Sequence, residues 1–134
     1  GRGPAPYTGL RVGMAAGLSI ASALGVPAYG VMVLDAVAHS VGVGKFALSS
    51  DAKRREFFVA GYENSKRVFG PSVMSPSELE SLEGFEILPG IADAAKVGLY
   101  AEHALKLGID LSDTSALYLR SPDVSPSPGK KVDG

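Results

Sequence analysis

The sequence contains no cysteine and no tryptophan, and only two histidines among its 134 residues. Without cysteine the chain can form neither disulfide bonds nor a thiolate metal site, which is compatible with a cytoplasmic protein. His39 and His103 lie far apart in the sequence, and neither has a second histidine at the spacing of metal ligands. We therefore predict no metal site and expect both histidines to face solvent or to cap helices.

Strong net charge and long apolar runs are also absent. The net charge is −1, so no overall field attracts nucleic acid or an anionic membrane. The longest apolar stretch, residues 12–34, is interrupted by Gly25 and Pro27, which argues against a membrane-spanning helix. With 46% hydrophobic and 20% charged residues the composition is typical of a globular chain, and we expect it in the cytoplasm.

What the sequence does contain is a glycine- and proline-rich start that continues into a helix. Residues 1–7 are predicted to form a loop, and Thr8 can cap a helix that begins at Gly9 and ends at Leu24. Gly25, followed by a proline, stops this helix. Apart from Arg11 the helix is uncharged, so we expect it to be covered on most sides.

Glycine recurs at every fourth position of this helix. Gly9, Gly13 and Gly17 form one stripe that continues through Ala21 to Gly25. Each interior glycine costs about 0.5–1 kcal/mol relative to alanine, so the repeat needs a reason, and close approach of another backbone is the usual one. Two compatible interpretations stay open: packing on the protein's own sheet, and packing on a helix of a partner subunit.

A phosphate-binding loop is another interpretation of the early glycines. Backbone N–H groups at the start of a helix can hold phosphate. The loop fits neither G-x-x-x-x-G-K-[ST] nor G-x-G-x-x-G, however, and Pro4 and Pro6 remove two donors. We therefore predict no cofactor.

The remaining patterns predict alternating helices and strands. They are, in order, a buried strand at residues 28–33, a helix at 34–41, a meander of strands near 46–50, 56–62 and 67–74, a helix at 76–84, a strand at 86–89 and a helix at 92–107. Pro71 marks a bulge or a sheet edge, and a capping box from Ser75 to Glu78 opens the helix after the meander.

This order predicts an α/β fold with two unequal parts. Residues 45–120 have the β-β-β-α-β-α order of a ribonuclease-H-like half. Residues 1–44 do not form a layered domain alone, because one strand cannot cover two helices, so we interpret them as the remnant of a first half whose strands would precede Gly1. Residues 121–134, rich in serine, proline, glycine and lysine, are predicted to be a flexible tail.

The charged residues supply no catalytic machinery. Asp35, Asp51 and Asp93 are scattered over a helix start, a turn and a loop, and no nucleophile–base pattern accompanies them. The basic turn at residues 53–55 lies beside two acidic residues and is expected to be solvated. Contact with RNA phosphate is the alternative, although no aromatic platform surrounds the turn in the sequence.

The opening motif resembles that of a known family. The run Gly3-Pro4-Ala5-Pro6-Tyr7-Thr8-Gly9-Leu10-Arg11-Val12-Gly13 is similar to the G-P-G-[PS]-[FY]-T-G-[LV]-R-[IV]-G signature of the TsaB (YeaZ) family, with alanine where the third family position is usually glycine. Three later segments agree: residues 29–38, residues 51–58 with the family's D-A-R-x-x-E pattern, and the closing Y-L-R at 118–120. The match covers nearly the whole chain.

The resemblance implies a role in making threonylcarbamoyladenosine in transfer RNA. It implies an actin-like ATPase fold of two ribonuclease-H-like halves, the first of them truncated here. It also implies a non-catalytic subunit that dimerises through a helical face with its catalytic paralogue TsaD, joined by the ATPase TsaE. A homodimer is the alternative, and a separate chain could carry the missing N-terminal part. The transfer RNA would be contacted only through the complex.

The resemblance also bears on catalysis. The catalytic paralogue carries an H-x-E-G-H metal motif, and the corresponding stretch here, residues 33–37, has valine at both histidine positions. Valine cannot bind a metal ion, so this departure favours a non-catalytic role. The family has also been labelled glycoprotease, but no residue pattern here supports proteolysis.

The glycine helix is the predicted subunit interface. We expect its neighbourhood to comprise Gly9, Leu10, Arg11, Gly13, Met14, Gly17 and Leu18. Two competing hypotheses remain: a nucleotide-binding enzyme of the same fold, a transferase or kinase, and a homodimeric relative without the paralogue.

Overall fold

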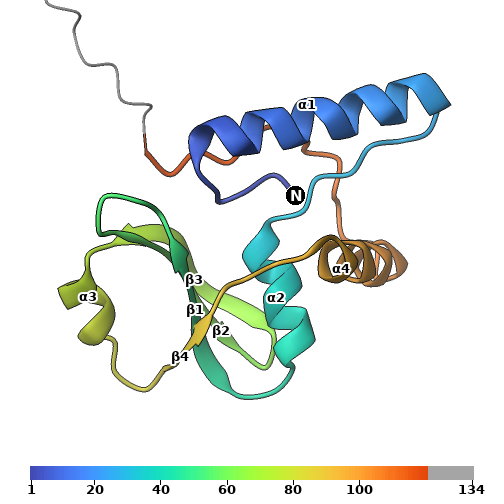
Figure 1. Ribbon diagram of the computed structural model, residues 1–134. Helices are drawn as coiled ribbons and strands as arrows, with labels where there is room; N and C mark the ends of the chain where they lie inside the picture. Colours follow the sequence, from blue (N-terminus) through green and yellow to red (C-terminus); the bar gives the residue numbers. More distant parts are fainter. Residues whose placement is uncertain (121–134) are drawn as a thin grey trace, which may run out of the picture.

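The protein is an α/β chain in which helices flank one four-stranded sheet (Figure 1). The computed structural model describes residues 1–120, and the tail predicted at residues 121–134 lies outside them. The elements, in chain order, are α1 (Tyr7–Leu24), α2 (Val33–Val41), β1 (Lys45–Asp51), β2 (Phe57–Glu63), β3 (Lys66–Met74), α3 (Pro76–Glu80), β4 (Glu86–Pro89) and α4 (Ala94–Lys106).

The sheet has the strand order β3-β2-β1-β4. β1 pairs antiparallel with β2, and β2 with β3, so the predicted meander is confirmed. β4 returns parallel to β1, with Phe46 opposite Glu86. Pro71 lies on β3 at the edge of the sheet, where its missing N–H breaks no internal ladder.

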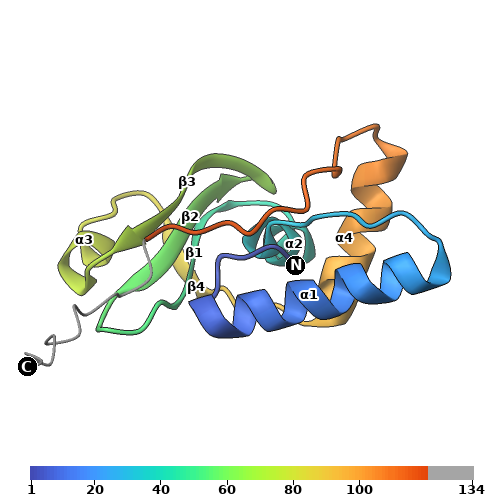
Figure 2. The ribbon, with the colours of Figure 1, turned by 90° about the horizontal axis from the view of Figure 1, so that it is seen from above.

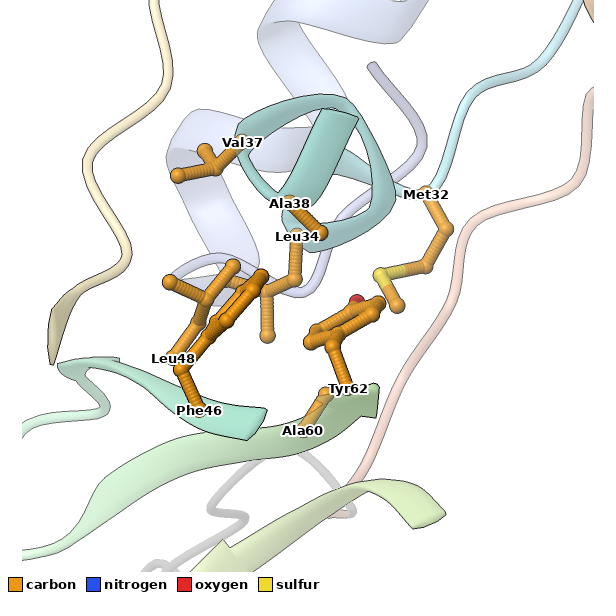
Figure 3. Packing of buried hydrophobic residues seen from close by; sticks show 8 residues of the cluster. All are labelled: Met32, Leu34, Val37, Ala38, Phe46, Leu48, Ala60 and Tyr62. Atoms are coloured by element: carbon orange, nitrogen blue, oxygen red, sulfur yellow. The ribbon is translucent and has the colours of Figure 1, made fainter. Parts of the chain in front are cut away.

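The main core lies between α2 and one face of the sheet (Figure 3). Strand alternation places Phe46 and Leu48 of β1 and Tyr62 of β2 on this face, where all three are almost completely buried. Leu34 and Ala38, one helical turn apart on α2, pack onto them. Burying several large side chains together makes this contact the main source of stability in the described chain.

The second helix of this side, α4, packs against α2 rather than against the strands. Ala36 of α2 and Ala104 of α4 are fully buried in a smaller cluster with Val31 and Leu111. α3 lies on the other side of the sheet (Figure 1).

On the opposite face of the sheet, two phenylalanine rings pack together above Gly61. The ring of Phe69 lies over Gly61, close enough that no side chain fits at that position. Phe69 in turn meets Phe85 edge to face, with ring centroids 5.2 Å apart. Glycine at position 61 is therefore required by this packing.

Two predicted element boundaries are wrong. α1 begins at Tyr7 with Pro6 as its N-cap, and the Leu10 N–H already donates to the Pro6 carbonyl, so Thr8 lies inside the first turn and caps nothing. α3 ends at Glu80 rather than near residue 84, with Ser81 as its C-cap. Its predicted cap is confirmed, since the Ser75 hydroxyl accepts from the Glu78 N–H.

The predicted strand at residues 28–33 is also wrong, although Val31 and Met32 are buried as expected. The backbone of this segment bonds to two different stretches of chain. The Arg2 N–H donates to the Val31 carbonyl, and the Gly30 N–H donates to the Leu111 carbonyl. These isolated bonds do not build the continuous ladder that a strand needs. The division of the chain at residue 44 into two parts stays a prediction.

Helix α1 stands apart from this core (Figures 1 and 2). Leu10 is its only buried residue, although the sequence predicted cover on most sides. None of the helices within residues 1–120 has the length and apolar character that crossing a membrane requires.

Two glycine substitutions are expected to act with opposite signs. Gly61→Ala should lower the free energy of unfolding by about 1–3 kcal/mol, because a methyl group there forces the Phe69 ring away. Gly17→Ala should raise it by about 0.5–1 kcal/mol, because this helical position has open space around it. Urea unfolding followed by circular dichroism measures both. An equal decrease in the free energy of unfolding of the two variants would show that α1 packs tightly within the chain.

Candidate functional site

The three glycines of the predicted interface lie on a part of α1 that nothing in the described chain covers. A Cβ placed on Gly9, Gly13 or Gly17 meets no atom of another element within 4 Å. Packing on the protein's own sheet, one of the two interpretations of the glycine stripe, is therefore wrong within residues 1–120. Of the predicted set only Leu10 is buried, and Met14 is half-buried. We call the stripe of Gly9, Gly13 and Gly17 the glycine face.

The glycine face borders a hollow of about 260 Å³. Four predicted residues line it: Gly13, Met14, Gly17 and Leu18. Its other wall is the segment of residues 27–30, together with the first two residues of the chain. The sequence did not reveal this second wall, because no periodic pattern links Tyr29 to α1.

Large apolar side chains are exposed on α1 and on the segment that follows it. Val12, Ile20 and Leu24 of α1 are 65%, 61% and 69% exposed, and Val26 and Tyr29 are about half exposed. Arg11, the one charged residue of α1, turns back along the helix, and its guanidinium lies 5.4 Å from the centroid of the Tyr7 ring. Several large apolar side chains exposed on one uncovered helix favour a protein–protein contact there.

The wall opposite α1 is held by residues from three distant parts of the chain. The Arg2 guanidinium donates to an Asp113 carboxylate oxygen at 2.9 Å and to the Ser115 carbonyl at 2.9 Å. The Leu117 N–H donates to the Arg2 carbonyl. Residues 1–3, 30–33 and 111–117 therefore run side by side next to α1 (Figure 2), and they fix the position of residues 27–30.

Val33 and Val37, the positions that the resemblance matches to the metal-motif histidines, lie one turn apart on α2. Val37 is 3% exposed and belongs to the main core, where it contributes apolar packing. Between the valines, Asp35 accepts a hydrogen bond from the Tyr62 hydroxyl at 2.8 Å and lies 3.5 Å from the Arg67 guanidinium. Asp35 thus ties the start of α2 to β2 and β3.

Partial burial shifts the pKa values of both Asp35 and Tyr62. Desolvation raises the pKa of the Asp35 carboxyl above its ordinary value, and the Tyr62 hydrogen bond and the Arg67 charge offset part of that rise. Burial also raises the pKa of the Tyr62 hydroxyl, with the Asp35 charge adding to the effect, so that the hydroxyl stays a donor at neutral pH.

The other predicted polar residues occupy structural positions. Asp51 accepts from the Lys53 N–H in the turn after β1, and Asp93 accepts from the Lys96 N–H as the N-cap of α4. They do not meet Asp35. His39 and His103 do meet, unexpectedly, with ring centroids 4.4 Å apart at the ends of α2 and α4. Residues 1–120 contain no group of three possible metal ligands.

Comparison with known proteins places the chain among TsaD and YeaZ relatives. The family model described as TsaD, tRNA N6-adenosine threonylcarbamoyltransferase, matches residues 1–121. The uncharacterized protein Rv3421c of Mycobacterium tuberculosis is 34% identical over 137 residues, a match that covers 94% of this chain and 64% of that protein. The uncharacterized protein ML0378 of Mycobacterium leprae is 34% identical over 148 residues, covering 94% and 38%. The chain thus spans less than two thirds of the length of these relatives.

Two solved structures from Pseudomonas aeruginosa share the fold. One is described as an uncharacterized protein with similarity to peptidase YEAZ; it superposes with a TM-score of 0.70 at 19% identity and covers 90% of this chain and 71% of its own. The other, YeaZ, gives 0.69 at 19% identity and covers 89% and 72%. The predicted α/β fold class and the resemblance to YeaZ are confirmed.

The raised pKa of Asp35 predicts a specific pH dependence. Because the folded chain holds the Asp35 proton more tightly than the unfolded chain, this residue's contribution to stability falls as pH rises above about 4. Asp35→Asn keeps an acceptor for Tyr62 and removes the partly buried charge. Its stability relative to the parent protein should therefore increase between pH 4 and pH 7.

The measurement is urea unfolding of both proteins across this range. The difference between them is the relevant quantity, because hydrogen bonds lower the pKa values of Asp51, Asp110 and Asp113 and give both proteins an opposite slope. A constant difference from pH 4 to pH 7 would contradict the prediction.

Tyr62→Phe should lower the free energy of unfolding by about 1–3 kcal/mol, because it removes the hydroxyl that donates to Asp35.

Proposed function

The chain belongs to the TsaD family of tRNA N6-adenosine threonylcarbamoyltransferases, and we propose that it acts there as a non-catalytic scaffold for threonylcarbamoylation of adenosine in transfer RNA. In this proposal its glycine face packs on the matching helix of the catalytic paralogue TsaD. That contact holds the catalytic subunit in its active arrangement. The observation that carries the proposal is the uncovered glycine face.

The geometry of α1 supports a helix as the occupant of that face. Three glycines on one stripe cost the isolated helix about 0.5–1 kcal/mol each, and nothing in the described chain offsets the cost. A glycine stripe lets a second helix approach more closely than the usual 8–10 Å between axes. The exposed Val12, Ile20 and Leu24 would then gain cover at the edges of the contact.

The residues of α2 support a non-catalytic role. The two positions that bear histidines in the catalytic paralogue's motif are Val33 and Val37, and Val37 lies in the apolar core. Neither side chain has an atom that can coordinate a metal. Asp35, the acidic residue between them, is already engaged by Tyr62 and Arg67.

The remaining partners follow from the same proposal. The ATPase TsaE would join the complex, transfer RNA would be bound by the assembled complex, and the setting would be the cytoplasm. A homodimer through the glycine face is the alternative arrangement.

A matched pair of leucine substitutions tests the interface. Gly13→Leu should abolish co-purification with the catalytic paralogue, because the side chain projects from the centre of the glycine face. Gly98→Leu is the control: Gly98 is also an exposed helical glycine with open space around it, but it lies on α4. Neither change should alter the circular dichroism of the chain alone. Complex formation by Gly13→Leu at the parent level would contradict the proposal.

The competing enzyme hypothesis is distinguished by an assay of the protein alone. Under the scaffold proposal, the chain without a partner should not turn over ATP in the presence of Mg²⁺. Turnover without a partner would favour a kinase or transferase of the same fold. Sizing the protein alone and with the catalytic paralogue separates the homodimer from the heterodimer.

A further inference from the structure

Two histidines that are far apart in the sequence meet between α2 and α4. His39 lies in the last turn of α2 and His103 in the last turn of α4. Their ring centroids are 4.4 Å apart, and the ring planes are tilted by 30°. The two helices pack against each other through Ala36 and Ala104 (Figures 1 and 2). The histidine pair therefore spans a contact between two helices, and no step of the scaffold proposal uses it.

The pair lies on a different side of α2 from the valines that the resemblance matches to the metal motif. His39 follows Val37 by two residues, which at about 100° per residue turns its side chain to the far side of the helix. Val37 packs in the main core, whereas His39 contacts the rings of Tyr100 and His103 on α4. The histidine pair is thus a separate location in the fold.

The ring nitrogens of the pair are available to a ligand. Within residues 1–120, neither imidazole takes part in a hydrogen bond or an ion pair. Tyr100 meets the His39 ring edge to face, with centroids 5.9 Å apart, and so supports the ring from α4. His39 is half-buried and His103 is exposed, so solvent reaches the pair. A neutral imidazole has one nitrogen lone pair, which makes it a common metal ligand.

The separation of the rings fits two ligands of one metal ion. With nitrogen–metal bonds of about 2.0–2.1 Å, two imidazoles bound at a right angle have ring centres about 4.5 Å apart, and at a tetrahedral angle about 5.2 Å apart. The observed 4.4 Å matches the right-angle arrangement. Right angles between nitrogen ligands are typical of Cu²⁺ and Ni²⁺ in tetragonal sites.

The helix ends also favour a cation at this place. Each helix carries a partial negative charge of about half an elementary charge at its C-terminus, and both histidines lie in last turns. Lys106, the other basic residue in the last turn of α4, pairs with Glu102 at 2.9 Å, which offsets its charge.

We propose that His39 and His103 together bind one divalent transition-metal ion of tetragonal preference, Cu²⁺ or Ni²⁺, with water at its remaining positions. The ion joins the last turn of α2 to the last turn of α4 and stabilises the contact between the two helices. Sequence spacing did not reveal the pair, because its members come from different helices that only the fold brings together.

Titration of the full chain with NiCl₂, followed by calorimetry at about pH 8 where imidazole is neutral, measures the binding. One Ni²⁺ per chain is expected. His39→Ala and His103→Ala should each weaken binding by at least about 10-fold, since loss of even an outer partner of a metal ligand costs 10- to 100-fold. MgCl₂ should not bind, because Mg²⁺ takes oxygen ligands. No Ni²⁺ binding by the parent chain, or parent-level binding by either variant, would overturn the proposal.

A matched control and a second measurement test the bridge between the helices. Leu105→Ala shortens a side chain in the same turn as His103 but removes no metal-binding atom, so its Ni²⁺ affinity should equal that of the parent. NiCl₂ should raise the Tm of the parent and of Leu105→Ala, and it should leave the Tm of both histidine variants unchanged.

An equal rise of Tm in a histidine variant would show that one histidine suffices, and it would overturn the bridge, provided that circular dichroism shows all variants folded. Complex formation with the catalytic paralogue is measured separately, so either proposal can fail without the other.

Discussion

The contact between α2 and the sheet is the interaction on which the described structure depends. Leu34 and Ala38 lie on Phe46, Leu48 and Tyr62, and all five are buried. This packing fixes α2, and through α2 it fixes α4. It also positions the segment before α2, whose backbone bonds to residues 1–3 and 111. The wall that faces the glycine face is thus held in place by a core that α1 itself does not join.

The same dependence explains why α1 can be an interface. A helix face that packs in the core cannot also contact a partner. α1 contributes only Leu10, so its glycines and exposed apolar side chains are available without cost to the fold. The start of α2, by contrast, contributes directly to the folded core. Val37 belongs to the core and Asp35 to a partly buried polar contact, so these positions support the fold.

Local patterns allowed most of the fold to be predicted from the sequence. The alternation in β1 and β2, the capping box at Ser75 and the glycine after α1 are short-range signals, and the structure confirms each. The segment of residues 28–33 failed because its apolar content matches both a strand and a buried irregular segment. Only its separated partners, Arg2 and Leu111, decide between them. Tertiary hydrogen bonding is not encoded in a local pattern.

The same limit applies to functional surfaces: those built from one local pattern could be predicted, and contacts between distant parts of the chain could not. The glycine face follows from spacing on one helix, so its residues could be predicted. The contact between Tyr7 and Tyr118 joins opposite ends of the described chain, and no local pattern connects the two residues.

Because α1 carries both Tyr7 and the glycine face, one rigid element links the glycine face to the contact between Tyr7 and Tyr118. Ten residues separate Tyr7 from Gly17, which at 1.5 Å per residue is about 15 Å along the axis. A partner that packs on the glycine face would therefore hold the first turn of α1, and with it the contact to Tyr118, in a fixed orientation. Docking through the glycine face can in this way fix the position of a chain segment that meets α1 about three helical turns away.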